Sequence, residues 1–287
     1  RMVSGLNVDF CFVPYYRCPI LPVKNKYLTV VHDLNALHFP EYFSKPKYYW
    51  LKYYWKYSIS NATKIVAISN FVRNDIVDKY KVESSKIDVI YNPIQKDCSL
   101  VDFDGLSRKY GIEEYQYYYI VSSLHKHKNL LTILRMMHVL LNKSNNCPKL
   151  VISGIKVGAR TELMDFIEEM GLTECCVFTG FVSDEERNTL MKYSKIFLFP
   201  SVFEGFGMPP IEAKRLGAKV LTTKCAAIPE VTQNRLMYVD NPFDENEWAD
   251  KVQKCEKEVQ DVLSYVCYNP EVIALEYYQL FCNYCIV

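Results

Sequence analysis

The sequence predicts an α/β protein with two doubly wound parallel sheets. Short, bulky apolar segments alternate with helical segments along the chain, and Asn92-Pro93 interrupts the alternation about a third of the way along. Segments such as Ile196–Phe199 contain consecutive large apolar residues, which is typical of a parallel strand buried on both faces. With 287 residues, of which 49% are hydrophobic, the chain can bury two sizeable cores.

The segment before Asn92-Pro93 is expected to contain four strands, Val8–Val13, Tyr27–Val31, Lys64–Ile68 and Ile87–Tyr91. One helix is expected over about 46–60. Another is expected after Ser69, whose hydroxyl suits the N-cap position.

A second alternation follows a connector over residues 97–115 that is expected to be polar. Its strands are expected at Tyr117–Ser122, Leu150–Ser153, Cys176–Thr179, Ile196–Phe199, Lys219–Thr222 and Met237–Val239. We therefore expect an N-terminal domain over residues 1–95 and a C-terminal domain over 96–265. A final helix over 266–287 is expected to pack back towards the first domain.

Composition excludes several classes of protein. A formal net charge of +1 argues against a general nucleic-acid binder. The 11 cysteines are odd in number and scattered, which predicts reduced thiols and a cytoplasmic location. The pair Cys282-x-x-Cys285 has no second pair at zinc-site spacing, so we assign it to helix packing. No apolar run approaches the length of a membrane span, so the protein is expected to be soluble or to rest on the cytoplasmic membrane face.

The stretch from Phe199 to Ala213 predicts a ligand site where a strand gives way to a helix. Pro209 or Pro210 suits the first helical position, and the helix N-terminus attracts anions such as phosphate. Gly205 and Gly207 would let a bulky ligand reach the backbone. Glu204 and Glu212 would repel a phosphate, so they are better explained as acceptors for sugar or ribose hydroxyls. The alternative is an ordinary helix start with acidic residues and turn glycines.

The same stretch, Glu204-Gly-Phe-Gly-x-Pro-x-x-Glu212-Ala, is followed by Gly217-Ala-Lys-Val-Leu and Ile228-Pro-Glu-Val. Together these segments resemble the E-x7-E signature of retaining glycosyltransferases of the GT-B fold, family 4 (glycosyl transferases group 1). The resemblance implies two Rossmann-like domains that face a cleft. It implies transfer of a hexosyl unit from a GDP- or UDP-sugar to a glycan or glycolipid acceptor in cell-surface polysaccharide synthesis, without a cofactor.

The resemblance also implies roles for individual residues. Glu204 would lie against the donor sugar, and Glu212 would bind the ribose. The intervening backbone would meet the diphosphate and the sugar, at Gly205, Phe206, Gly207 and Met208.

Tyr118–Leu130 resembles the first C-terminal strand of the family and its basic loop. Lys128 matches the lysine that binds the diphosphate, and Ser123 is assigned to the donor site, while His127 replaces the usual arginine. The alternative is a solvated basic loop. Val177–Val182 resembles the turn that receives the base, which adds Phe181 to the donor site, although a plain strand end explains this segment almost as well.

Val30-Val31-His32-Asp33 resembles the strand end whose histidine lines the cleft in this family. Loops at the carboxyl ends of parallel strands bind ligands in α/β proteins, which independently favours His32. Asp33 is expected to orient His32 or the loop. Only one apolar strand, with Gly5 near it, precedes this segment, so we expect the N-terminal domain to lack roughly its first 80 to 100 residues.

The resemblance implies a front-face substitution, in which the leaving diphosphate takes the acceptor proton. The predicted catalytic residues are Glu204, His32 and Lys128. Two alternatives stay open: a donor-binding module without transfer activity, and a GT-B nucleotide-sugar 2-epimerase. The motif Asp102-Phe-Asp104 has a metal-binding form, but it precedes a helix that Asp would cap, so no metal is expected.

Residues 42–74 contain six basic residues and no acid, with seven Tyr and Trp residues interleaved over 48–57. Such a helix could rest on an anionic membrane surface or receive a lipid-linked acceptor. The alternative is a half-buried helix whose lysines form its wet face.

Overall fold

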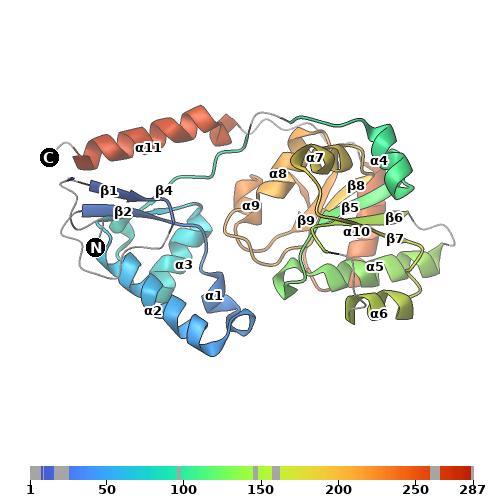
Figure 1. Cartoon of the computed structure of the whole chain (residues 1–287), viewed down its shortest axis with the longest axis horizontal. Coiled ribbons are helices and arrows are strands. Elements are labelled where there is room, and N and C mark those ends of the chain that lie inside the picture. The colour runs from blue at the N-terminus through green and yellow to red at the C-terminus, as the bar shows by residue number, and fades with distance from the viewer. Residues whose placement is uncertain are drawn as a thin grey trace. The chain divides into compact units, whose positions relative to one another are not determined.

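The computed structural model describes residues 8, 10–15, 26–95, 98–144, 148–156, 162–258 and 266–285. Contacts divide the chain into two compact units. Unit 1 comprises Arg1–Ile94, Glu204–Phe206 and Val266–Val287, and unit 2 comprises Gln95–Phe203 and Gly207–Tyr265. The colours of Figure 1 follow the chain through both units.

The described part of unit 1 contains a parallel sheet in the order β1-β2-β3-β4. Its strands are β1 (Phe10–Val13), β2 (Lys26–Val31), β3 (Lys64–Ala67) and β4 (Ile87–Val89). Its α-helices are α1 (Asn35–His38), α2 (Lys45–Asn61), α3 (Asn70–Tyr80) and α11 (Pro270–Cys285). Short 3-10 turns lie at Pro40–Tyr42, Ser84–Lys86 and Val266–Tyr268.

The expected strands of unit 1 lie where the structure has strands, with shifted ends. Val8, Ile68 and Tyr91 fall outside the strands, and Asp9 lies outside the described residues. Ser69 caps α3 as expected, because its side chain accepts a hydrogen bond from Val72 N at 3.1 Å.

The last helix packs on the first strand. The Phe281 ring of α11 lies 5.1 Å from the Phe12 ring of β1, and Tyr277 lies 5.7 Å from Phe12, both with edge-on geometry. The Nζ atom of Lys64, in β3, lies 5.6 Å from the centre of the Tyr284 ring of α11. Both ends of the chain therefore contribute to unit 1.

Unit 2 contains a parallel sheet in the order β10-β9-β8-β5-β6-β7 within the described residues. Its strands are β5 (Tyr117–Val121), β6 (Lys149–Ser153), β7 (Cys176–Gly180), β8 (Ile196–Phe199), β9 (Val220–Thr223) and β10 (Met237–Val239). β5 lies between β6 and β8, so the direction of winding reverses beside β5. This is the position where open α/β sheets bind ligands.

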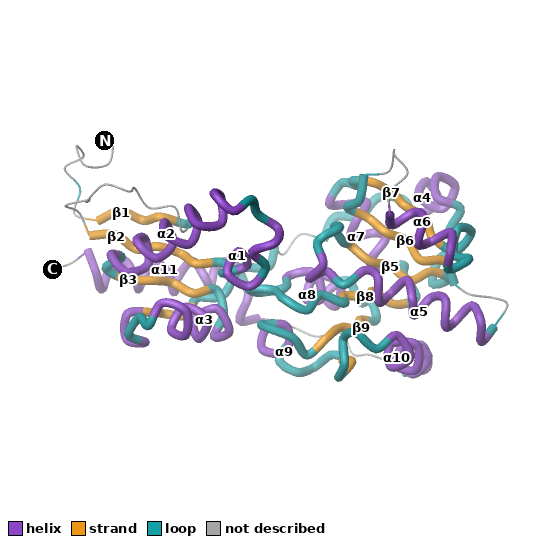
Figure 2. The backbone as a smooth tube through the Cα atoms, turned by 90° about the horizontal axis from the view of Figure 1, so that it is seen from below, coloured by secondary structure: helices purple, strands orange, loops and turns teal. Residues whose placement is uncertain are grey.

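The helices of unit 2 are α4 (Phe103–Tyr110), α5 (Leu130–Lys143), α6 (Glu162–Glu169), α7 (Asp184–Lys192), α8 (Met208–Arg215), α9 (Ile228–Val231) and α10 (Glu245–Lys257), with a 3-10 turn at Lys126–Lys128. The backbone tube in Figure 2 shows these helices alternating with the strands of the sheet.

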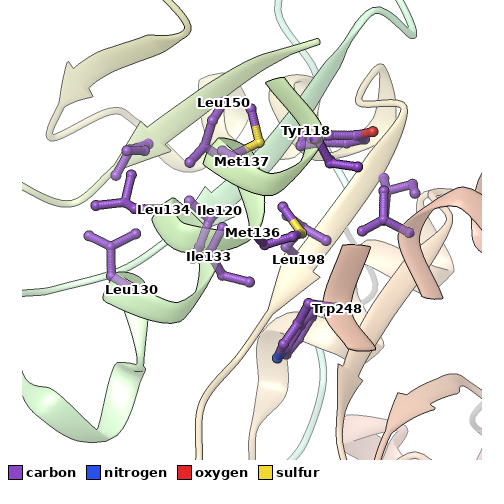
Figure 3. Close-up of a cluster of buried hydrophobic side chains, with 14 of the residues drawn as sticks. Tyr118, Ile120, Leu130, Ile133, Leu134, Met136, Met137, Leu150, Leu198 and Trp248 are labelled. Atoms are coloured by element: carbon purple, nitrogen blue, oxygen red, sulfur yellow. The ribbon is translucent and has the colours of Figure 1, made fainter. Parts of the chain in front are cut away.

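Both faces of the unit 2 sheet are buried. Along β5, Tyr118 and Ile120 belong to one apolar cluster, whereas Tyr117 and Tyr119 belong to another. Because successive strand residues point to opposite faces, the two clusters are the two sides of the sheet. In Figure 3 the first cluster joins α5, the strands and the fully buried Trp248 of α10.

The connector over residues 97–115 is not simply polar, because it contains α4. Phe103 and Leu106 of this helix are buried, and Asp102 caps it by accepting a hydrogen bond from Gly105 N at 3.2 Å. The capping role expected for Asp102 is therefore present, while the helix itself begins two residues before Gly105 and buries an apolar face. Asp97 lies outside the described residues.

No helix in the described part of the chain has both the length and the apolar character needed to cross a bilayer.

Candidate functional site

The loop after β8 leads into α8 through Gly207. Gly207 has φ of 88°, in the left-handed region that favours glycine, and it occupies the N-cap position. Met208 is the first helical residue, so the expectation that Pro209 or Pro210 would be first is wrong. Because prolines occupy the next two positions, Gly207 and Met208 supply the unpaired N–H groups at this helix start. An anion at the loop would therefore meet these two donors.

Glu212 lies in α8 one turn further on, and it is mostly buried. Burial raises the pKa of its carboxyl above the ordinary value, whereas the charge of Arg187 opposes this shift. Arg187 of α7 reaches Glu212 with an Nη2–Oε2 distance of 3.7 Å, and its Nη1 lies 2.9 Å from Asp184 Oδ1. Arg187 Nε is buried without a hydrogen-bond partner among the described residues. Sequence reasoning missed Arg187.

The basic loop after β5 is tied to the loop after β8. Val202 N donates to His127 O at 2.8 Å, and Ser201 Oγ donates to the same oxygen at 3.2 Å. Asn129, in the left-handed region at φ 53°, ends the turn. Since β5 and β8 are neighbours, these bonds hold the two loops side by side at the carboxyl edge of the sheet.

Lys128 lies in this tied loop. Its Nζ lies 5.9 Å from the centre of the Phe199 ring, at the end of β8. The rings of His125 and His127 stack on each other with centroids 5.6 Å apart. Lys128 therefore lies beside the start of the loop that carries Gly207.

Ser123 lies in the loop after β5, and Phe181 follows β7 at the same edge of the sheet. Ser123 lines a cavity of about 550 Å³ with Leu124, Leu131 and Phe166, and Lys128, Glu212 and Phe181 do not line it. Phe181 follows β7 and is 78% exposed. A second cavity, of about 640 Å³, lies at the opposite strand ends beside Tyr117 and Lys149 and contains none of the predicted site residues.

In unit 1, His32 and Asp33 directly follow β2. The His32 Nε2 atom lies 3.0 Å from Pro14 O, and its ring lies 5.5 Å from that of Tyr15. Asp33 Oδ1 accepts a hydrogen bond from Asn35 N at 2.9 Å, which fixes the loop that enters α1. Burial raises the pKa of Asp33, and the nearby charge of Glu204 raises it further, against the lowering effects of this bond and His32.

Three residues of the predicted site, Glu204–Phe206, belong to unit 1 by their contacts. Ser69 Oγ donates to Gly205 O at 2.7 Å in a buried position. A side chain on Gly205 would place Cβ 1.9 Å from His32 O. The space at Gly205 is therefore occupied by backbone, which differs from the expectation that it admits a ligand.

Phe206 is 3% exposed, and its ring packs 5.3 Å from Tyr268 and 6.1 Å from Tyr91. Its side chain therefore belongs to the interior of unit 1. Phe206 could therefore contribute only its backbone atoms to a ligand site.

The structure thus forms two groups of predicted residues. His32, Glu204 and Gly205 lie together in unit 1, and Lys128, Gly207, Met208 and Glu212 lie along the edge of β5 and β8 in unit 2. No group of three His, Cys, Asp or Glu side chains among the described residues could hold a metal ion. The side chain of Cys285 lies outside the described part.

Two parallel-sheet units with a glycine-bearing strand–loop–helix at the reversal point define the GT-B fold, with Rossmann-like units. The chain belongs to the glycosyl transferases group 1 family, whose model matches residues 102–263. Residues 10–97 match the model of glycosyltransferase family 4.

Characterised relatives are similar over most of this chain. The O-antigen chain mannosyltransferase RfbU of Salmonella typhimurium is 27% identical over 251 residues, which cover 88% of this chain and 66% of RfbU. The serotype-specific mannosyltransferase WbdA of Escherichia coli is 24% identical, over 85% of this chain and 31% of WbdA. The chain thus spans less than two thirds of either relative.

Solved structures show the same fold at low identity. Sucrose-phosphate synthase from Thermosynechococcus elongatus has a TM-score of 0.75 at 14% identity, over 98% of this chain and 75% of that protein. Anabaena HepE, solved in complex with UDP and glucose, has a TM-score of 0.73 at 17% identity, over 91% of this chain and 72% of HepE.

Proposed function

We propose that this protein is a retaining glycosyltransferase that moves a hexosyl unit from a nucleoside diphosphate sugar to a glycan or glycolipid acceptor. The observation that carries the proposal is the loop pair at β5 and β8. It sets Lys128 and the Gly207 and Met208 N–H groups on adjacent strand ends. One lysine and two backbone donors suit a diphosphate, because a helix N-terminus and a cation both favour its negative charge.

Glu212 would accept hydrogen bonds from the ribose hydroxyls of the donor. A carboxylate is suited to this task only while it is ionised, and Arg187 favours the ionised form. Glu204 would hold hydroxyls of the transferred sugar. Ser123 and the backbone beside Phe181 would complete the donor site towards the base.

The reaction would proceed on one face of the sugar. The bond from the anomeric carbon to the diphosphate oxygen breaks, and its electron pair leaves with the diphosphate. The acceptor oxygen bonds to the same face, and its proton passes to the departing diphosphate oxygen. Lys128 and the helix start would stabilise the developing charge, so that no metal is required, and His32 would line the sugar side.

The named activities of the relatives make mannose the first sugar to test, from a GDP or UDP donor. RfbU and WbdA are mannosyltransferases of O-antigen and serotype-specific chains. We propose a corresponding role in cell-surface polysaccharide synthesis, at the cytoplasmic side where nucleotide sugars are made. A donor-binding module without transfer activity is a second candidate, because the chain spans only part of the length of these relatives.

Calorimetry with GDP-mannose, UDP-glucose and an ADP-sugar tests donor binding by this chain. One donor should bind with micromolar affinity, and Lys192→Ala, a change elsewhere on α7, should leave that affinity unchanged. Transfer to a lipid-linked acceptor, followed by analysis of the anomer formed, then tests the reaction. Binding without transfer would support the donor-binding module, an inverted product would exclude the retaining mechanism, and the absence of binding to all three donors would overturn both candidates.

A further inference from the structure

We infer that Ser69 is a positioning residue for Glu204, the residue proposed to bind the transferred sugar. The inference rests on the proposed function and gives a second role to a residue expected only to cap a helix. Its key observation is one buried hydroxyl that makes two hydrogen bonds. Ser69 Oγ accepts from Val72 N at 3.1 Å and donates to Gly205 O at 2.7 Å. Ser69 therefore connects the start of α3 to the residue that follows Glu204.

The two bonds use the Ser69 hydroxyl in opposite ways. A serine hydroxyl has one hydrogen to donate and two lone pairs that accept. The hydrogen points to Gly205 O, so Val72 N meets a lone pair, and the two partners together fix the rotation of the hydroxyl. An ionised aspartate would also cap the helix, but it has no hydrogen for a carbonyl oxygen. The bond to Gly205 thus uses a property of serine that capping alone does not require.

The backbone of Gly205 also meets the end of β2. A Cβ on Gly205 would lie 1.9 Å from His32 O, so the two backbones approach at a distance that only glycine allows. His32 directly follows β2, and Ser69 lies two residues after β3. These strands are neighbours in the sheet of unit 1 (Figure 2). Two adjacent strand ends therefore fix Gly205, one at its Cα and the other at its carbonyl group.

The ring of Phe206 is a separate anchor of the same segment. It packs 5.3 Å from the Tyr268 ring and 6.1 Å from the Tyr91 ring. These contacts fix a side chain two residues after Glu204, whereas the bond from Ser69 acts on the residue next to it. Packing of the Phe206 ring is thus the alternative explanation for a fixed segment. A variant that removes only the hydroxyl separates the two.

A fixed Gly205 determines where the Glu204 carboxylate can lie. The charge of Glu204 acts on the nearby Asp33 carboxyl group, and two ionised carboxylates repel each other. If the Glu204 backbone were free, this repulsion would move its side chain away from Asp33. The bond from Ser69 opposes that movement. Hydrogen bonds to sugar hydroxyls depend on such positioning, because they weaken steeply when distance and angle change.

The expected effect of Ser69 is limited to the sugar part of the donor. Ser69 and Glu204 belong to unit 1 by their contacts. The residues proposed to bind the diphosphate and the ribose belong to unit 2, and they are Lys128, Gly207, Met208 and Glu212. A change at Ser69 should therefore weaken binding of a donor that carries a sugar. It should leave binding of the corresponding nucleoside diphosphate unchanged.

Calorimetry with GDP-mannose and GDP, and with UDP-glucose and UDP, tests this difference. Ser69→Ala and the similarly shaped Ser69→Cys should each raise the Kd of the donor that binds about tenfold, the effect of one charged hydrogen bond. The Kd of the matching diphosphate should not change. Ser69→Thr keeps a hydroxyl, so it should bind the donor as the unchanged chain does. The cysteine variant serves if Ser69→Ala does not fold, since a thiol is only a weak donor.

Hydrogen exchange of the chain without ligand tests the contact directly. A peptide that contains Glu204–Phe206 should exchange about tenfold faster in Ser69→Ala and Ser69→Cys, and at the unchanged rate in Ser69→Thr. Asp102→Ala is the matched control, because it removes a cap of the same kind from α4. It should leave the exchange of this peptide and both Kd values unchanged.

Three outcomes would overturn the inference. Unchanged exchange of the Glu204–Phe206 peptide in Ser69→Ala would mean that the Phe206 ring fixes the segment alone. An equal loss of affinity for the donor and for its diphosphate would mean that Ser69 acts on the whole site. Changes in Ser69→Thr as large as those in Ser69→Ala would mean that the hydroxyl is not the cause. A chain that binds no donor would overturn the proposed function instead, and the exchange rates would still show whether Ser69 fixes the segment.

Discussion

Arg187 Nη2 lies 3.7 Å from Glu212 Oε2, although 24 residues and the whole of β8 separate them in sequence. The same guanidinium contacts Asp184 at 2.9 Å. Burial favours the protonated form of Glu212, and Arg187 favours the ionised form. The pair therefore determines how much of Glu212 can act as a hydrogen-bond acceptor at a given pH.

Arg187→Gln should weaken donor binding through Glu212. Loss of the cation raises the pKa of Glu212 further above its ordinary value of 4.5, so protonation begins at a higher pH. We expect the donor Kd of the variant to rise as the pH falls, by about tenfold once Glu212 is protonated, the effect of one charged hydrogen bond, and this rise should begin at a higher pH than in the unchanged protein. Calorimetry across a pH series measures both effects.

A nucleotide without ribose hydroxyls supplies the control for Arg187. A 2′,3′-dideoxynucleoside diphosphate cannot bond to Glu212, so its Kd should be equal in the unchanged protein and in Arg187→Gln. If its affinity also falls tenfold, Arg187 acts on the fold of the loop or on the phosphates and not through Glu212.

Lys128→Ala should weaken binding of the diphosphate and leave nucleoside binding unchanged. A lysine that pairs with phosphate contributes about 1.5 to 3 kcal/mol, which corresponds to roughly 10- to 150-fold in Kd. The neighbouring Lys126 is exposed on the same turn, so Lys126→Ala is the matched control. Equal losses in the two variants, measured by calorimetry, would mean that the loop attracts phosphate by its overall charge.

Gly205→Ala should destabilise the fold. The added Cβ would lie 1.9 Å from His32 O, and a backbone atom cannot move aside as the end of a side chain can. We expect a loss of about 1–3 kcal/mol, typical of overpacking, seen as a lower midpoint in urea. Gly105→Ala is the control, because a Cβ in that helix meets nothing closer than 4.0 Å. Equal midpoints in the two variants would contradict the close approach at Gly205.

Asp33→Asn should stabilise the protein above the ordinary pKa of aspartate. The folded state holds a proton on Asp33 at pH values where the unfolded state has lost it, because burial raises the folded pKa above 3.8. Stability of the unchanged protein therefore falls as the pH rises through this window, and the penalty persists above it. Asparagine keeps the oxygen that Asn35 N bonds, without the charge.

Thermal midpoints measured from acid to mildly basic pH test the Asp33 prediction. The advantage of Asp33→Asn should be largest at the highest pH and should vanish towards the ordinary aspartate pKa. Exposed Asp78 on α3 gives the control, since Asp78→Asn should show no such trend. An advantage of Asp33→Asn that grows towards acid would have the wrong sign.

Local sequence signals predicted the elements well where burial alone determines them. The strand Ile196–Phe199 has the expected ends, because four bulky apolar residues have few alternatives to a strand buried on both faces. Ser69 was predictable as a cap from its position before a helical segment. The helix α4 was expected after Asp102, which suits a cap, but its buried face was not expected in a polar connector, because only Phe103 and Leu106 of its eight residues are buried.

The sequence predicted which residues belong to the candidate site better than it predicted which residues they contact. Gly205, Glu204 and Glu212 were singled out because charged and glycine residues cluster where a strand meets a helix. The partners of these residues were not predictable, since Arg187, Ser69 and His32 lie far from them in sequence. No local sequence pattern predicts which distant side chain or backbone carbonyl will contact a given residue.

Because α11 packs against β1, unit 1 cannot complete its packing during synthesis until α11 has been made. Phe12 is made among the first residues of this sequence, whereas Phe281 and Tyr277 are made among the last. Unit 2 consists of one nearly continuous stretch between them and can therefore fold first. Until α11 is released from the ribosome, β1 lacks the side chains that cover it, so this strand of the nascent chain is exposed to aggregation while the segment between β1 and α11 is made.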